Sequence, residues 1–207
     1  MSKRKREIPN RQRKPVIALV CEGKNKTERK YFNHFKDRYG LYNLFVYNSE
    51  STDILSMAKK CRQIFKNDQM DKKEGDRIFC LVDLDLSYTQ YEKYLSAKKK
   101  YKEVNFIVSN PCFEIWLLYY FIDNPEITSS SQKVKEQLKR YVPQYTESFD
   151  IVEKCNLSDM YSVAINRSQK KKGIMDLNKP LQEINPYTEI DDLITYLMAY
   201  NKEEFND

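Results

Sequence analysis

The fold is decided by an uninterrupted apolar run that ends in an acidic pair, Ile78-Phe79-Cys80-Leu81-Val82-Asp83-Leu84-Asp85. A second run of the same kind, Val16-Ile17-Ala18-Leu19-Val20, leads into Cys21-Glu22-Gly23. Apolar runs without alternation are typical of strands that are buried on both faces, as in parallel sheets. The two runs therefore predict two inner strands, each of which is followed directly by acidic residues.

Strand-like and helical segments alternate around these two runs. In chain order we expect a strand at 16–20, a helix at 27–39, a strand at 44–47, a helix at 52–67, a strand at 78–82, a helix at 88–101 and a strand at 104–108. This order predicts a parallel α/β sheet with helices on both faces.

Beyond this sheet the pattern is mainly helical. Asn110 is expected to cap a helix whose first turn contains Pro111, and further helices are expected at 130–141, 160–169 and 190–201. The predicted organisation has three parts: a basic tail (1–14), an α/β core (15–125) and a mainly helical C-terminal portion (126–207).

The net charge of +6 comes from one end of the chain. Seven of the 36 Lys and Arg residues lie in residues 1–14, with one of the 30 Asp and Glu residues, so the rest of the chain is neutral. Attraction to nucleic acid would therefore come from this tail and from the basic clusters at 98–102 and 167–172. Each cluster is equally well explained as a solvated surface.

The sequence also predicts a cytoplasmic protein. It contains no apolar run as long as a membrane span, and its basic N-terminus does not resemble a signal peptide. Five scattered cysteines without a CxxC pair indicate reduced thiols, and a zinc site is not expected with one histidine.

Three acidic residues are the main candidates for a functional site. The carboxyl ends of parallel strands meet at one edge of a sheet, so Glu22, Asp83 and Asp85 are expected to lie close together. In an extended segment Asp83 and Asp85 would share one face. Three carboxylates repel one another unless a hard divalent cation binds, which predicts Mg²⁺ (or Mn²⁺) as the cofactor. Asp83 alone would be explained better as an exposed acid or a turn residue after a strand; the Asp pair and the second acidic strand end favour a functional site.

Further candidates surround these three acids. Glu114 lies in an almost wholly apolar helix, where a carboxylate needs a partner, a metal or the favourable dipole of a first helical turn. Basic side chains that could contact phosphates of a nucleic acid are Lys24, Lys26, Arg167, Lys170, Lys171 and Lys172.

A different reading of the acidic pair leads to another class of enzyme. Asp83-Leu84-Asp85-Leu86-Ser87 approximates the Asp-x-Asp-x-Thr opening of haloacid-dehalogenase-like phosphatases. That motif normally follows the first strand of its domain, whereas a whole α/β unit precedes it here. We therefore rank a phosphatase well below a metal-dependent site.

Four motifs in order resemble RloB-like proteins. They are Cys21-Glu22-Gly23 with Thr27-Glu28 and Tyr31-Phe32, then Val82-Asp83-Leu84-Asp85, then Ser109-Asn110-Pro111-Cys112-Phe113-Glu114-Ile115-Trp116-Leu117, and finally Asn185-Pro186-Tyr187-Thr188. RloB-like proteins resemble Toprim domains, a Rossmann-like fold in which a Glu and an Asp-x-Asp pair bind magnesium. The resemblance implies Glu22, Asp83 and Asp85 as ligands. The second-metal ligands of OLD-type nucleases have no clear counterpart in this sequence, and Glu28 and Glu114 are considered for that role.

The resemblance also implies a function. The chain would be a metal-dependent endonuclease acting on RNA such as tRNA, or on DNA, in bacterial anti-phage defence by abortive infection. Its partners would be nucleic acid and an ATPase of the ABC or AAA type encoded alongside, with no membrane association. The alternative is a non-catalytic nucleic-acid-binding or regulatory subunit of a defence complex. Oligomeric state stays open.

Overall fold

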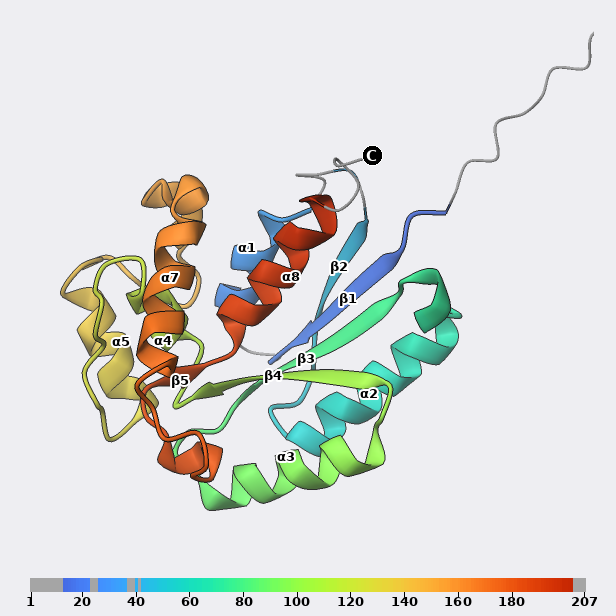
Figure 1. Ribbon diagram of the computed structural model, residues 1–207, viewed down its shortest axis with the longest axis horizontal. Helices are drawn as coiled ribbons and strands as arrows, with labels where there is room; N and C mark the ends of the chain where they lie inside the picture. Colours follow the sequence, from blue (N-terminus) through green and yellow to red (C-terminus); the bar gives the residue numbers. More distant parts are fainter. Residues whose placement is uncertain (1–12, 23–25, 37–39, 41, 203–207) are drawn as a thin grey trace, which may run out of the picture.

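A computed structural model describes residues 13–22, 26–36, 40 and 42–202 (Figure 1). The sheet in these residues consists of β1 (Val16–Cys21), β2 (Asn43–Asn48), β3 (Arg77–Asp83), β4 (Val104–Asn110) and β5 (Tyr187–Thr188). The α-helices in the same residues are α1 (Lys26–Asn33), α2 (Ile54–Asn67), α3 (Tyr88–Lys100), α4 (Glu114–Leu118), α5 (Ser131–Lys139), α6 (Ile151–Lys154), α7 (Tyr161–Lys172) and α8 (Ile190–Lys202).

The sheet has the strand order β2-β1-β3-β4-β5. Strands β1 to β4 pair in parallel, and β5 pairs antiparallel to β4 through Ser109 with Thr188 and Asn110 with Tyr187. The predicted α/β class is confirmed, and the two apolar runs form the neighbouring strands β1 and β3. Strand β5 was not predicted, because two residues are too few to show a strand pattern.

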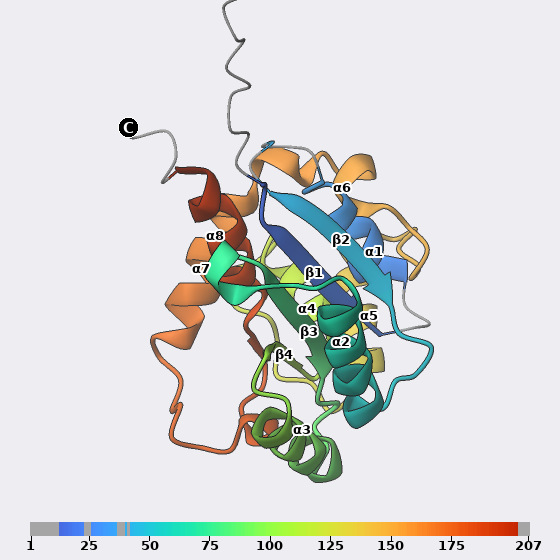
Figure 2. The same cartoon turned by 90° about the vertical axis from the view of Figure 1, so that its right-hand side faces the viewer.

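Helices cover both faces of the sheet, with α2 and α3 on one face and α1, α4 and α8 on the other (Figures 1 and 2). Successive side chains of β1 feed two separate cores: Ile17 and Leu19 belong to the larger core, and Ala18 and Val20 to the smaller. This explains why β1 reads as continuously apolar.

The C-terminal portion shares the larger core with the sheet. Val134 on α5, Tyr161 on α7 and Leu193 on α8 are buried together with Trp116 of α4 in that core. Residues 126–202 are thus packed on the α/β part rather than forming a core of their own. In the described part of the chain, no helix is both long and apolar enough to cross a membrane.

The predicted helices form, with changed ends. Helix α1 ends at Asn33, short of the predicted residue 39, and 37–39 lie outside the described residues. Helix α2 begins at Ile54, two residues after the predicted start, and Asp53 caps it: the Asp53 carboxylate accepts a hydrogen bond of 3.0 Å from the Ser56 N–H.

The expectation that Asn110 caps a helix is wrong. Asn110 is the last residue of β4, and α4 begins only at Glu114. The Asn110 side chain is fully buried, and its amide nitrogen donates to the backbone carbonyls of Leu181, Gln182 and Ile184. Its oxygen accepts from the Leu86 N–H, so it ties the end of β4 to two distant segments instead of starting a helix.

Most of the predicted basic tail lies outside the described residues, which begin at Arg13. Arg13 forms an ion pair of 3.0 Å with Asp76, a fully buried carboxylate at the start of β3. Asp76 also accepts hydrogen bonds from the backbone N–H groups of Val16 and Asp71. This carboxylate fixes the amino end of the sheet, opposite the edge where the acidic residues gather.

Candidate functional site

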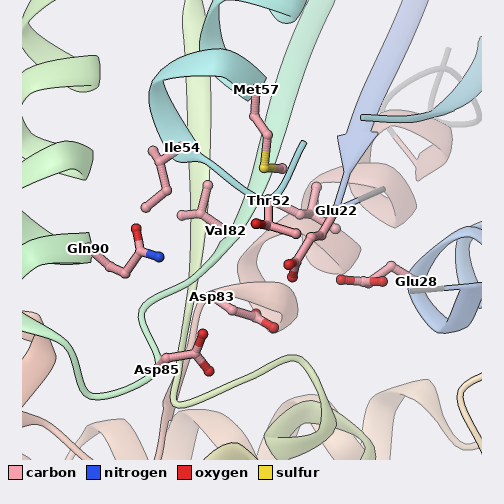
Figure 3. A pocket seen from close by; sticks show the side chains of 10 residues that line it. Glu22, Glu28, Thr52, Ile54, Met57, Val82, Asp83, Asp85 and Gln90 are labelled. Atoms are coloured by element: carbon pink, nitrogen blue, oxygen red, sulfur yellow. The ribbon is translucent and has the colours of Figure 1, made fainter. Parts of the chain in front are cut away.

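Four acidic side chains line one cavity at the carboxyl ends of β1 and β3. The cavity has a volume of about 60 Å³, and its acidic lining consists of Glu22, Glu28, Asp83 and Asp85. The side chains of Glu22, Glu28 and Asp83 point toward one another, with Asp85 beyond Asp83 (Figure 3). Thus the fold places the three predicted ligands in the lining of one cavity and adds a fourth carboxylate from α1.

Asp83 and Asp85 reach this cavity in a way that strand alternation did not predict. Strand β3 ends at Asp83, and both Asp85 and Leu86 have left-handed backbone conformations, with φ of 50° and 59°. The Asp85 N–H donates to the Pro111 carbonyl at 3.0 Å, and the Ser131 hydroxyl donates to the Asp85 carboxylate. A turn held by the end of β4 and by α5 therefore aims Asp85, so the assumption of an extended segment was wrong.

Glu28 is the most confined carboxylate of the cavity. It is 3% exposed, and its Oε2 atom has no hydrogen-bond partner among the described residues. Burial, and then repulsion by Glu114 and Glu22, raises the pKa of Glu28 to about 8. The sequence signal for this residue was the Thr27-Glu28 step of the first motif, which the analysis of strand ends did not use.

Glu114 is also buried, at 2% exposed, and it has the partners that its apolar helix requires. The Tyr145 hydroxyl donates to Glu114 Oε1 at 2.8 Å and lies 3.3 Å from the Thr27 hydroxyl. The Nζ atom of Lys135 on α5 is 3.8 Å from the same Glu114 oxygen. Glu114 lies outside the cavity lining but close enough to act on its charges.

The cavity carries negative charge that its surroundings compensate poorly. Burial raises the pKa of Asp83 well above its ordinary range, and repulsion from Glu28, Glu114 and Glu22 adds to the rise. Burial also raises the pKa of Glu22, with Asp85 as the strongest repelling charge. Each of these groups is stabilised either by a proton or by a nearby cation.

The donor set suits a hard cation, although it is not gathered around one point. Carboxylate oxygens are the ligands that Mg²⁺ prefers in proteins. Within the described residues, no group of three or more Asp, Glu, His or Cys side chains is arranged so that it could hold a metal ion as it stands. The residues fit magnesium by their chemistry, and binding would require them to move closer together.

The predicted nucleic-acid-binding residues lie elsewhere or outside the description. Lys24 and the side chain of Lys26 fall outside the described residues. Arg167 forms an ion pair of 2.5 Å with Asp123 and donates to the carbonyls of Tyr119 and Tyr120. These contacts join α7 to the segment after α4, and a role for Arg167 in binding nucleic acid stays a prediction.

The remaining predicted basic residues form the last turn of α7, namely Lys170, Lys171 and Lys172. Lys172 is paired at 2.7 Å with both Asp191, which is fully buried, and Asp192. Lys172 therefore has a structural partner at the start of α8, whereas Lys170 is exposed. None of the three lines the acidic cavity.

Two cysteines flank the site, and both are suited to packing rather than chemistry. Cys21 and Cys112 are buried, and burial raises the pKa of each thiol well above its ordinary value. The thiolate is the reactive form of cysteine. Cys21 and Cys112 are therefore buried free thiols, in agreement with the prediction of reduced cysteines.

Comparison with known proteins identifies the family. The model of the family described as RloB-like protein matches residues 17–197. A search of curated proteins gave no match. The matched range contains all four motifs and every carboxylate of the cavity. The chain therefore belongs to the RloB family.

Proposed function

We propose that this RloB-family chain is a magnesium-dependent endonuclease of the Toprim type, which cuts nucleic acid in bacterial defence by abortive infection. The observation that carries the proposal is the cavity itself. It gathers Glu22, Asp83 and Asp85 with the buried Glu28 at the carboxyl edge of a parallel sheet. The Oε2 atom of Glu28 has no hydrogen-bond partner among the described residues. Ligand sites of open α/β sheets form at this edge.

The residues would divide the work as follows. Glu22, Asp83 and Asp85 offer the oxygens that would hold the ion, and their mutual repulsion without a cation favours its binding. Magnesium bound there would hold the scissile phosphate, lower the pKa of an attacking water and stabilise the leaving oxygen. Glu114, fixed by Tyr145, would place a further carboxylate beside the cavity.

The experiment compares nucleic-acid cleavage with and without metal. Purified protein is incubated with labelled tRNA, single-stranded RNA and plasmid DNA in Mg²⁺, Mn²⁺ or EDTA, alone and with an ATPase encoded alongside. The variants are Glu22→Gln and Asp83→Asn, which remove charge and keep shape. Glu136→Gln is the matched control, because Glu136 is an exposed carboxylate on α5 that does not line the cavity.

Cleavage that needs metal, survives Glu136→Gln and is lost in both cavity variants would support the proposal and name the substrate class. The alternative of a non-catalytic subunit would be supported by the absence of cleavage under every condition, if the wild-type protein and both cavity variants bind nucleic acid equally well.

A further inference from the structure

One lysine of the C-terminal portion lies beside the acidic cavity, at the buried carboxylate of Glu114. Lys135 lies on α5, and its Nζ atom is 2.5 Å from Glu147 Oε1 and 3.8 Å from Glu114 Oε1. Its positive charge also opposes the burial that raises the pKa of Glu22 and of Glu28. Lys135 therefore acts electrostatically on two of the cavity's carboxylates.

The two carboxylates that pair with Lys135 differ in their exposure to solvent. Glu114 is 2% exposed and is held in place by the Tyr145 hydroxyl, so this carboxylate is a fixed anchor. The Glu147 side chain is 45% exposed, where water competes for both groups and an ion pair contributes little to stability. The ammonium group can therefore leave Glu147 readily while it stays near Glu114.

A lysine in this position has a use that the carboxylates cannot supply. A phosphodiester is an anion, and several carboxylates at the cavity would repel it even after one cation is bound. A compact ammonium group can offset that repulsion and contact a phosphate oxygen directly. The side chain is 21% exposed, which leaves the ammonium group accessible from outside.

We infer that Lys135 contacts a phosphate of the substrate, and that Glu147 occupies its ammonium group when no substrate is bound. The inference deepens the proposed function and rests on it. Lys133 provides a matched comparison on the same helix, since it is exposed and lies on a different cavity, beside Glu126 and Arg140.

The test measures binding of a fluorescent oligonucleotide of the class that the wild-type protein cleaves. Binding is followed by anisotropy in Ca²⁺ at several KCl concentrations, and cleavage is measured separately in Mg²⁺. Lys135→Gln should weaken binding about tenfold and flatten the plot of log Kd against log [salt] by about 0.7, the slope for one lost phosphate contact on a single strand. Lys135→Arg should keep the wild-type slope, and Lys133→Gln should change neither quantity.

Glu147→Gln gives an independent readout, because its exposed position makes misfolding improbable as a cause of change. Freeing the ammonium group should tighten binding by about two- to fivefold with an unchanged slope. Equal slopes for Lys135→Gln and the wild-type protein, or unchanged affinity in Glu147→Gln, would overturn the inference while wild-type cleavage leaves the proposed function standing. A wild-type protein that neither binds nor cleaves nucleic acid refutes both.

Discussion

Replacing Glu28 by Gln should stabilise the metal-free protein at alkaline pH and leave it nearly unchanged in acid. Burial raises the pKa of Glu28 from 4.5 to about 8, so the folded protein resists its ionisation. Below pH 4.5 the group is neutral in both the folded and unfolded states. As the pH rises from about 4.5 to about 8, the unfolded state releases the proton first, and the wild-type protein loses stability that the variant keeps.

The size of this effect follows from the two pKa values. At about 1.4 kcal/mol for each pH unit between them, the full difference is about 5 kcal/mol above pH 8. Water that enters the cavity would screen the charge and reduce this figure, so it is an upper limit. A difference of about 2 kcal/mol at pH 8.5 would already be well outside the error of a denaturation experiment.

Urea unfolding in EDTA at pH 5 and pH 8.5 measures the effect directly. Trp116, the one tryptophan of the sequence, is fully buried and reports unfolding by its fluorescence. Glu136→Gln serves as the control, because Glu136 is an exposed carboxylate that does not line the cavity. The reasoning is refuted by equal free-energy differences between Glu28→Gln and the wild-type protein at the two pH values, because Glu28 would then ionise normally.

Three further outcomes follow from the same geometry. Magnesium-dependent cleavage should rise between pH 6.5 and 8.5, because carboxyl groups with raised pKa must lose protons before they bind a cation; a flat pH–rate profile would contradict this. Tyr145→Phe should lower the free energy of unfolding by about 1–3 kcal/mol, since the buried Glu114 loses a donor; an unchanged urea midpoint would show that water replaces the hydroxyl. Asp76→Ala should cost about 3–5 kcal/mol, because it leaves Arg13 and two N–H groups without their buried partner. Cleavage per folded molecule should be unchanged in that variant, and a loss of activity would mean that the two ends of the sheet are coupled.

The inner strands could be predicted because their burial on both faces requires a continuous apolar run in the sequence. A strand covered on both faces, such as β1 or β3, must be apolar at every position, and this run is visible without any knowledge of the fold. Strand β5 has no such apolar run, because it consists of only two residues. Its two residues pair with β4 only because Asn110 and Ser109 meet them after the chain has crossed the molecule.

The part of the candidate site that directly follows inner strands could also be predicted from the sequence. Glu22 and Asp83 follow inner strands directly, so the position of the strand places the acid. The direction of the Asp85 side chain depends on a left-handed turn that is hydrogen-bonded to the residue after β4. The alternation of side chains along a strand does not predict such a turn. Lys135 and Tyr145 could not be found at all, because each looks like an ordinary residue of a helix or loop until folding brings it to Glu114.

The wide separation of the site's parts along the chain has a consequence for its synthesis. The carboxylates come from residues 22–114, whereas Ser131, Lys135 and Tyr145 leave the ribosome later, and the strand beside β4 later still. A nascent chain would carry its acidic residues without the groups that orient and balance them. If the chain is the endonuclease proposed above, its site would stay incomplete until the C-terminal portion has been synthesised.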